Sequence, residues 1–174
     1  MVKKKTNVAY LARLLLSTGA RVQEALKAEW SHISLERRLW VIPQTNSKSK
    51  KTRSVPLNDA AMAVLHELPT NGNGGYLFVG ADGKSRLQWP GQVWCKYRRS
   101  QEVNLPDLRL HDLRHAYAST LAASGVSLYQ IQHLLGHASP VMTQRYAHLV
   151  TDNLLEASNH AANAINQAMA ANDG

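Results

Sequence analysis

Cysteine is almost absent from this chain of 174 residues, with Cys95 as its only example. A single cysteine cannot form an internal disulfide, and it cannot supply several thiolates to a metal cluster. Long apolar runs are absent as well, since no stretch reaches the roughly 18 residues that a membrane-spanning helix requires. We therefore expect a protein of a reducing cytoplasm with no membrane segment. The length suits one domain with a hydrophobic core of its own.

Acidic residues are scarce relative to basic ones. The chain has 12 Asp and Glu against 20 Lys and Arg, which gives a net charge of +8 and a pI near 9.8. Such an excess indicates an anionic partner, and nucleic acid is the leading candidate. Charge alone does not distinguish nucleic acid from other anions, so the partner has to be argued from particular residues.

Apolar periodicity and turn residues predict a predominantly helical α+β domain. Apolar residues recur at helical spacing over 6–18, and Gly19 ends this helix, so a second helix is expected with Arg21 in its first turn. Two β-forming stretches, RLWVIP and TRSVPL, predict a small antiparallel hairpin over residues 38–56. The short apolar run YLFV predicts a third strand near 76–79.

Further helices are expected after the hairpin. Asn58 is a candidate N-cap for the stretch NDAAMAVLHEL, and a helix is predicted after Pro90 with Val93 among its inward residues. The glycine-rich TNGNGG between them lacks the lysine and hydroxyl of a phosphate-binding loop, so no nucleotide is expected. The last third is the most helical part, with breaks at Gly125 and Gly136.

The segment HDLRH, at residues 111–115, concentrates basic side chains. Residues three and four apart are neighbours on a helix, so His111, Arg114 and His115 form one basic cluster. Two histidines at this spacing can also bind zinc, but the metalloprotease pattern needs a glutamate beside the first histidine, where Asp112 stands here. A guanidinium next to a dication is electrostatically unfavourable, so we expect no metal.

Arginines, a lysine, histidines and a tyrosine together suit one type of reaction. When a phosphodiester is attacked, negative charge builds on its non-bridging oxygens, and guanidinium groups match these oxygens with paired donors. The leaving oxygen needs a proton, which lysine or histidine can supply. Nearby cations favour the phenolate of a tyrosine and lower its pKa from the usual value of about 10. Side chains that carry this positive charge make a metal ion unnecessary.

Four segments resemble the signature segments of the tyrosine recombinase (phage integrase) family, in the order in which that family has them. They are STGARVQEAL, SKSKKTRSVPL, LHDLRHAYAS and IQHLLGHASPVMTQRYAHL. One such segment is modest evidence, but four in order are hard to explain by coincidence, and they cover nearly the whole chain. The resemblance implies an integrase-like catalytic domain, which is a predominantly helical α+β fold with a small antiparallel sheet.

Carried over residue by residue, the resemblance implies a catalytic set. Arg21 and Arg114 would hold the scissile phosphate, and Tyr146 would attack it. His111 would transfer a proton or contact the phosphate, and His137 would donate a hydrogen bond to it. From residue type alone, Tyr146 also fits a buried aromatic residue whose hydroxyl has found a partner.

The resemblance also implies an acid and a supporting carboxylate. Lys48 would protonate the leaving 5′ oxygen, because it lies eight residues before Pro56, although Lys50 and Lys51 are adjacent alternatives. Glu24 would help to arrange the first segment. A further set is expected to contact DNA: Lys50, Lys51, Arg53, His115 and Arg145.

The resemblance further implies a reaction and partners. Double-stranded DNA would be cleaved through a 3′-phosphotyrosyl intermediate and rejoined to a partner strand, without metal, ATP or other cofactor. Four protomers would assemble on DNA, with residues 151–174 docking on a neighbour, while a monomer in solution is compatible with this chain. A bacterial cytoplasm is the expected compartment, with the gene carried by a bacterium or a phage.

Family members usually carry an N-terminal DNA-clamping domain before the first of these segments. Only about twenty residues precede Arg21 here. We therefore expect residues 1–174 to be a single catalytic domain without that clamp, which binds DNA weakly and with little sequence specificity on its own.

Two other functions remain open. The stretch VSLYQIQHLLGHASPVMTQRY is also similar to a helix-turn-helix, which would make the chain a DNA-binding regulator without catalysis. That function leaves Arg21, Lys48 and His111 unexplained, since they lie outside the stretch. Type IB topoisomerases use a similar residue set to relax DNA without exchanging strands. A topoisomerase would yield relaxed DNA without recombinants, whereas a recombinase would yield recombinant DNA.

Overall fold

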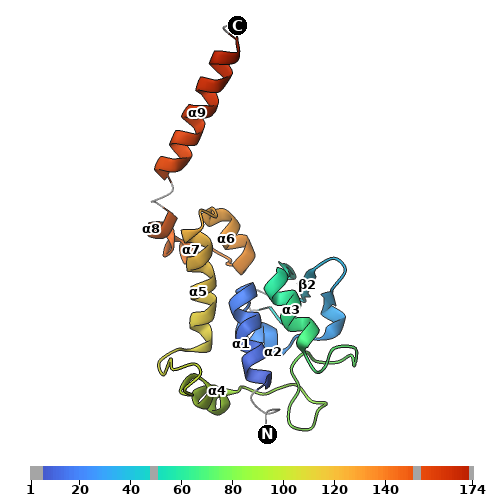
Figure 1. The fold of residues 1–174 in the computed structure, drawn as a ribbon. Coiled ribbons are helices and arrows are strands. Elements are labelled where there is room, and N and C mark those ends of the chain that lie inside the picture. The colour runs from blue at the N-terminus through green and yellow to red at the C-terminus, as the bar shows by residue number, and fades with distance from the viewer. Residues whose placement is uncertain (1–5, 48–50, 151–153, 173–174) are drawn as a thin grey trace. The chain divides into compact units, whose positions relative to one another are not determined.

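The computed structural model describes residues 6–47, 51–150 and 154–172. Helices account for most of the described chain, and a small sheet lies in its first half (Figure 1). The helices and strands run in the order α1 Thr6–Thr18, α2 Val22–Leu26, a 3-10 turn Trp30–His32, β1 Ile33–Ser34, β2 Leu39–Ile42, β3 Arg53–Pro56, α3 Asp59–Glu67, α4 Gly91–Arg98, α5 Leu110–Ala123, α6 Leu128–Leu135, α7 Val141–Gln144, α8 Ala147–Val150 and α9 Leu154–Asn172. None of the helices in these ranges combines the length and hydropathy of a membrane span.

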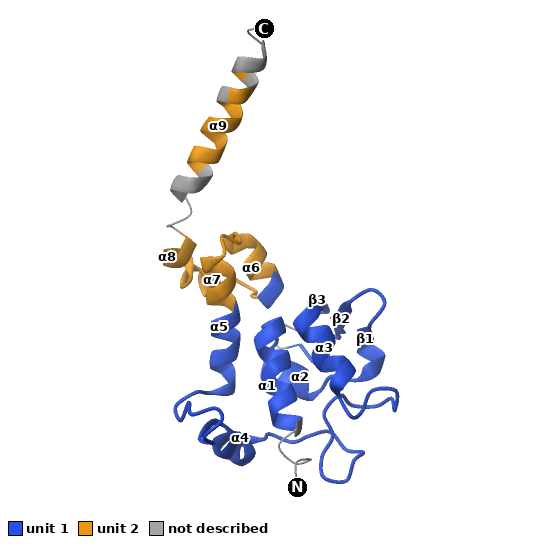
Figure 2. Ribbon diagram, viewed as in Figure 1, with its two compact units in different colours: residues 1–117, 134–136 blue, residues 118–133, 137–174 orange. Residues whose placement is uncertain are grey.

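The chain divides into two compact units (Figure 2). Unit 1 comprises Met1–Tyr117 and Leu134–Gly136, and unit 2 comprises Ala118–His133 and His137–Gly174. The last residues of α6 thus belong to unit 1, although they are far along the chain from its other elements. The expectation that all 174 residues form one catalytic domain stays a prediction.

The core of unit 1 is built around α1, which packs beside α3 (Figure 1). Leu11, Leu14 and Leu15 are fully buried on the inner side of α1, at the spacing that one face of a helix requires. The bounds predicted for this helix, 6–18, are confirmed. Asn58 caps α3 as predicted, because its side chain accepts a hydrogen bond from the backbone N–H of Ala61 at 2.9 Å.

The sheet of unit 1 is antiparallel, with the order β1-β2-β3. The predicted hairpin is confirmed, since β2 pairs with β3 and Trp40 lies opposite Val55 in the core. The third strand was predicted near 76–79 and lies instead at Ile33–Ser34. Residues 76–79 make only isolated bridges. Successive side chains of a strand point to opposite faces of the sheet, so a strand with one solvent-exposed face cannot bury two consecutive residues. Leu77 and Phe78 are consecutive and both fully buried.

Helix α4 begins directly after Pro90, as predicted. Trp94 is buried, but Val93 is 48% exposed, so the expectation that Val93 faces inward is wrong. The reason is helical geometry, since residues adjacent in sequence point about 100° apart and only one of the two can face the core squarely.

The regular elements of unit 2 are all helices among its described residues, joined by short turns. Ile131 on α6 is fully buried, as are Ala118 and Ala122 of α5. The predicted breaks are confirmed, because Gly125 and Gly136 have positive φ angles of 81° and 63° and each follows the end of a helix. The exposed side chains of α9 include two large apolar ones, Ile165 and Met169, at 59% and 63%.

Candidate active site

Arg21 stands at the start of α2 and is fixed there by a carboxylate. It is the N-cap of the helix, one position before the first turn in which it was expected, with extended backbone angles of −76° and 145°. Its backbone N–H donates to Oε2 of Glu24 at 2.9 Å, and its Nη1 donates to Oε1 at 2.9 Å. The side chain of Arg21 is 17% exposed and that of Glu24 is 1% exposed. Glu24 therefore holds both the backbone and the guanidinium of Arg21, and its supporting role in catalysis stays a prediction.

Glu24 also binds a second arginine, which sequence reasoning had not paired with it. Nη2 of Arg53 lies 2.7 Å from Oε2 of Glu24, and the Arg53 side chain is 10% exposed. Burial by itself raises the pKa of Glu24, but the hydrogen bond and charge of Arg53, followed by those of Arg21, outweigh it and hold the pKa below its ordinary value. Glu24 is thus ionised at neutral pH despite its burial.

The end of α6 organises three arginines at once. The carbonyls of its last two residues and of the glycine that follows each accept from a different guanidinium: Leu134 from Arg53 at 3.1 Å, Leu135 from Arg114 at 2.7 Å, and Gly136 from Arg21 at 3.1 Å. Carbonyls at a helix C-terminus lack intrahelical partners and carry the negative end of the helix dipole, so they suit cationic donors. Two of the three guanidinium groups, those of Arg21 and Arg53, also bind Glu24, so the three arginines and this carboxylate together keep a net positive charge.

Arg114 extends from α5 into the same network. Besides Leu135 it donates from Nη1 to the carbonyl oxygen of Gly19 at 2.5 Å, and it is only 4% exposed. The backbone at Gly19 approaches α5 closely, since an added Cβ would lie 2.4 Å from Cδ1 of Tyr117 and 2.8 Å from Cδ2 of Leu135. A residue without a side chain is therefore needed where Arg114 meets the α1–α2 turn.

Replacing Gly19 with alanine is expected to destabilise unit 1 through two separate effects. A positive φ of 61° costs a non-glycine residue about 1–2 kcal/mol, and the contacts with Tyr117 and Leu135 add about 1–3 kcal/mol of overpacking. Urea unfolding measures the sum. Gly74→Ala is the matched control, because Gly74 has a φ of 68° with no atom within 4 Å of the added Cβ. Equal losses in the two variants would contradict the close approach.

His111 and His115 lie on the same helix as Arg114. Their rings meet edge to face, with centroids 4.8 Å apart. Burial lowers the pKa of His111, and the neighbouring His115 and Arg114 lower it further. His111 is therefore neutral at neutral pH and able to accept a proton. Within the ranges that the structure describes, no three side chains of metal-binding type lie together.

Unit 2 brings together the other predicted residues, His137 and Tyr146, around a threonine. Nδ1 of His137 lies 2.8 Å from the hydroxyl of Thr143, which is 1% exposed. The backbone N–H of Tyr146 donates to the carbonyl of Thr143 at 3.0 Å. A hydroxyl that donates to Nδ1 leaves the proton of a neutral imidazole on Nε2, which is then a donor for a phosphate oxygen.

Tyr146 itself is 5% exposed. The stretch around it was expected to be one helix, but α7 ends at Gln144 and α8 begins at Ala147, so Tyr146 stands in the turn between them. This burial fits the alternative of a core tyrosine, and the role of Tyr146 as nucleophile stays a prediction.

Thr143 was missed by sequence reasoning, because one threonine in a polar stretch carries no signal of its own. Thr143→Val keeps the shape of the side chain but removes the hydroxyl from Nδ1 of His137. We expect the ¹⁵N shifts of His137 to show a mixture of tautomers, because the hydroxyl no longer selects one of them. Thr120→Val, at an exposed position of α5, is the control. Unchanged His137 shifts in Thr143→Val would rule out the tautomer role.

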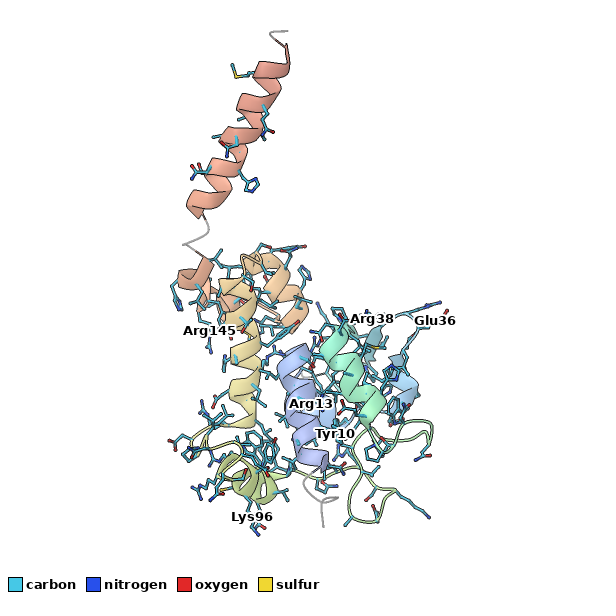
Figure 3. All side chains as sticks on the ribbon, viewed as in Figure 1. Tyr10, Arg13, Glu36, Arg38, Lys96 and Arg145 are labelled. Carbon is cyan, nitrogen blue, oxygen red and sulfur yellow. The ribbon has the colours of Figure 1, made fainter. Side chains whose placement is uncertain are left out.

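The remaining predicted residues are the acid Lys48 and the five residues expected to contact DNA, and those that the structure describes differ in exposure. Lys48 and Lys50 lie outside the described residues. Lys51 and Arg145 are exposed, as a DNA contact requires, and the side chain of Arg145 is labelled in Figure 3. His115 is partly buried, and its contact with DNA stays a prediction. Arg53 was expected to contact DNA as well, but its guanidinium is directed inward to Glu24 and the end of α6.

The structure thus combines a mostly helical fold and a small antiparallel sheet with three arginines gathered at the end of α6, two of which bind Glu24. The sequence matches the model of the Phage integrase family over residues 2–152, so the chain belongs to that family.

Three relatives illustrate the similarity. The chain is 32% identical over 152 residues to the integrase of Salmonella phage P22, which covers 81% of this chain and 39% of the phage protein. It is 30% identical over 172 residues to the tyrosine recombinase XerD of Rhizobium meliloti (strain 1021), covering 88% and 50%. The catalytic domain of bacteriophage HP1 integrase has a similar structure, with a TM-score of 0.66, 29% identity and coverage of 88% and 81%. The chain thus spans half or less of the length of these two curated relatives.

Proposed function

We propose that the chain is the catalytic part of a site-specific DNA recombinase, which cleaves and rejoins DNA through a 3′-phosphotyrosyl intermediate. The observation that carries the proposal is the arginine cluster at the end of α6, because two of its members, Arg21 and Arg114, occur in the segments that identify the family. The net charge of +8 supports double-stranded DNA as the partner.

In this proposal the scissile phosphate is bound by Arg21 and Arg114. Guanidinium groups offer several N–H donors in a rigid plane, and the bonds of Arg21 to Glu24 and Gly136 use one N–H of each Nη. The bonds to the protein fix the orientation of the plane, and the other donors stabilise the charge that develops on the non-bridging oxygens. Preorganisation of this kind costs no rearrangement at the moment of reaction.

The hydroxyl oxygen of Tyr146 attacks the phosphorus, and the bond from phosphorus to the 5′ oxygen breaks. The phenolic proton passes to neutral His111, and Lys48 gives a proton to the 5′ oxygen as it leaves. His137 donates from Nε2 to the phosphate. Attack by the 5′-hydroxyl of a partner strand reverses these steps, and the phosphotyrosyl link conserves the energy of the broken bond, so ATP is not required.

The proposal includes an assembly of four protomers on DNA. Synapsis of two DNA sites by four protomers requires contacts between protomers, and α9 is the proposed docking segment, with Ile165 and Met169 exposed. A chain ending at Val150 is then expected to keep single-site cleavage and to lose recombination. Normal recombination by that shortened chain would show that α9 is not the docking segment. A bacterial cytoplasm is the proposed compartment.

The test is a recombination assay in EDTA, with two copies of the DNA that flanks the source gene, one of them on a supercoiled plasmid. Recombinant products support the proposal. Relaxed plasmid without recombinants would favour topoisomerase-like relaxation, and binding without any cleavage would favour a regulator. Arg21→Lys is the inactive control, because an ammonium group cannot reproduce the planar pairing with both Glu24 and a phosphate.

A further inference from the structure

We propose that Arg53 is a positioning residue for Arg21, and that it acts through Glu24 and the end of α6 rather than by contact with DNA. The proposal rests on the proposed function, in which Arg21 binds the scissile phosphate. It assigns to β3 a part in shaping the phosphate site.

The first observation is the place of Arg53. It opens β3, opposite Ile42 of β2, and its side chain is directed into unit 1, with 10% of it exposed. Its Nε is buried and has no hydrogen-bond acceptor among the described residues. Its two Nη atoms therefore provide its hydrogen bonds to the protein, one to Glu24 at 2.7 Å and one to the carbonyl of Leu134 at 3.1 Å.

The second observation is that these bonds close a ring with those of Arg21. The guanidinium of Arg21 reaches the other oxygen of Glu24, and it also reaches the carbonyl of Gly136, two residues after the acceptor of Arg53. Both arginines thus use the same two supports, a carboxylate and the end of α6. If the loss of Arg53 displaces the Glu24 carboxylate or the end of α6, the guanidinium of Arg21 is displaced with it.

The third observation is the contact of the Arg53 stem with Gly136. A Cβ added to Gly136 would lie 2.5 Å from Cδ of Arg53 and 2.9 Å from its Nε. The aliphatic part of Arg53 therefore lies against the peptide whose carbonyl accepts from Arg21. Arg53 sets the position of that carbonyl by packing as well as by hydrogen bonding to Leu134.

The geometry requires arginine at this position. A planar guanidinium serves two acceptors from a single plane, whereas an ammonium keeps the charge but not the fixed angle between its bonds. Lysine at position 53 is therefore expected to keep the attraction to Glu24 and to lose the constraint on the end of α6. The conservative change separates charge from positioning.

The chain offers a matched control in Arg38, which is labelled in Figure 3. Arg38 also binds one carbonyl and one carboxylate, since Nε donates to Leu57 at 3.1 Å and Nη2 pairs with Asp59. Its side chain is 48% exposed, and neither acceptor belongs to the ring around Arg21. Arg38→Lys thus repeats the substitution and the type of contact without touching the phosphate site.

The experiment uses the full chain with ¹⁵N-labelled arginine and inorganic phosphate as the probe. Relaxation of the Nε–H groups first reports the order of Arg21 without ligand, and a phosphate titration then reports affinity at Arg21 and Arg114. In Arg53→Lys we expect the order parameter of Arg21 to fall and phosphate binding to weaken about tenfold, while Arg38→Lys changes neither. In a Glu24→Gln background, Arg53→Lys is expected to weaken phosphate binding by no more than a further factor of about two, because Arg53 acts on Arg21 largely through Glu24.

The outcomes separate this inference from the proposed function. An Arg21 order parameter that is unchanged in Arg53→Lys, or effects of Arg53→Lys and Glu24→Gln that multiply, would overturn the positioning role. If the Arg21 and Arg114 signals of the wild-type chain do not shift when phosphate is added, the proposed phosphate site is contradicted. The order parameter of Arg21 would still test the positioning role of Arg53, since it is measured without ligand. Folded and unfolded chains give separate signals, and Arg53→Gln is the second variant if Arg53→Lys does not fold.

Discussion

Tyr146→Phe is expected to abolish covalent attachment to DNA, with a fall in cleavage of at least about 1,000-fold, because the attacking oxygen is removed. Binding to duplex DNA is expected to stay within about twofold, since phosphate contacts by basic side chains dominate affinity. Tyr146 is 5% exposed and the variant keeps its buried ring, so we expect the variant to fold. Gel separation of denatured protein–DNA adducts and fluorescence anisotropy measure the two quantities.

Tyr129→Phe is the control for this experiment, because Tyr129 lies in the same unit but is 70% exposed. It is expected to cleave as the wild type does. Cleavage that survives in Tyr146→Phe and disappears in Tyr129→Phe would identify Tyr129, on α6, as the nucleophile. It would refute the assignment of Tyr146 from the family segments.

Glu24→Leu is expected to lower the free energy of unfolding by about 3–5 kcal/mol, because two largely buried guanidinium groups lose their only carboxylate among the described residues. Leucine fills most of the volume but accepts no hydrogen bond. Glu67→Leu is the matched control, since Glu67 pairs with Arg13 at 2.6 Å on the surface, where both side chains are about half exposed. A small effect for Glu67 and a large one for Glu24 is the expected contrast, measured by urea unfolding.

The pH dependence of this effect has a definite sign. The pKa of Glu24 is lowered in the folded chain, with burial opposing the shift and Arg53 and Arg21 producing it. The unfolded chain therefore binds more protons near the ordinary glutamate pKa of about 4.3, and stability is lost as pH falls through that range toward the folded value. The difference in stability between wild type and Glu24→Leu is expected to be full at pH 7 and to shrink below about pH 4. A difference that stays constant down to pH 3 would show that packing, not charge, is lost.

The elements that could be predicted from sequence are those set by local signals. The first helix, the cap at Asn58 and the break at Gly136 depend on apolar spacing or on one residue type, and all three are confirmed. The hairpin was found because two β-rich stretches flank a polar loop. The strand at Ile33–Ser34 was missed, since two residues contain no alternation to detect.

The arrangement of the site was less accessible. Arg21 and Arg114 were identified through family segments, but the pairing of Arg53 with Glu24 joins residues 29 apart in the chain, and its bond to Leu134 joins residues 81 apart. Such contacts depend on strand register and on where α6 ends, which no local pattern encodes. The same applies to Thr143, whose role follows only from its distance to His137.

The central claim is metal-free phosphotyrosyl chemistry at Tyr146. The most direct test incubates the chain in EDTA with nicked duplexes drawn from the DNA that flanks its gene, isolates adducts that resist denaturation, and maps them by mass spectrometry. The account predicts an adduct on Tyr146, linked to a 3′-phosphate, with a free 5′-hydroxyl on the other strand end. An adduct on another side chain, a 5′-phosphate link, or no adduct from this chain or from the longest protein that its gene encodes would contradict it.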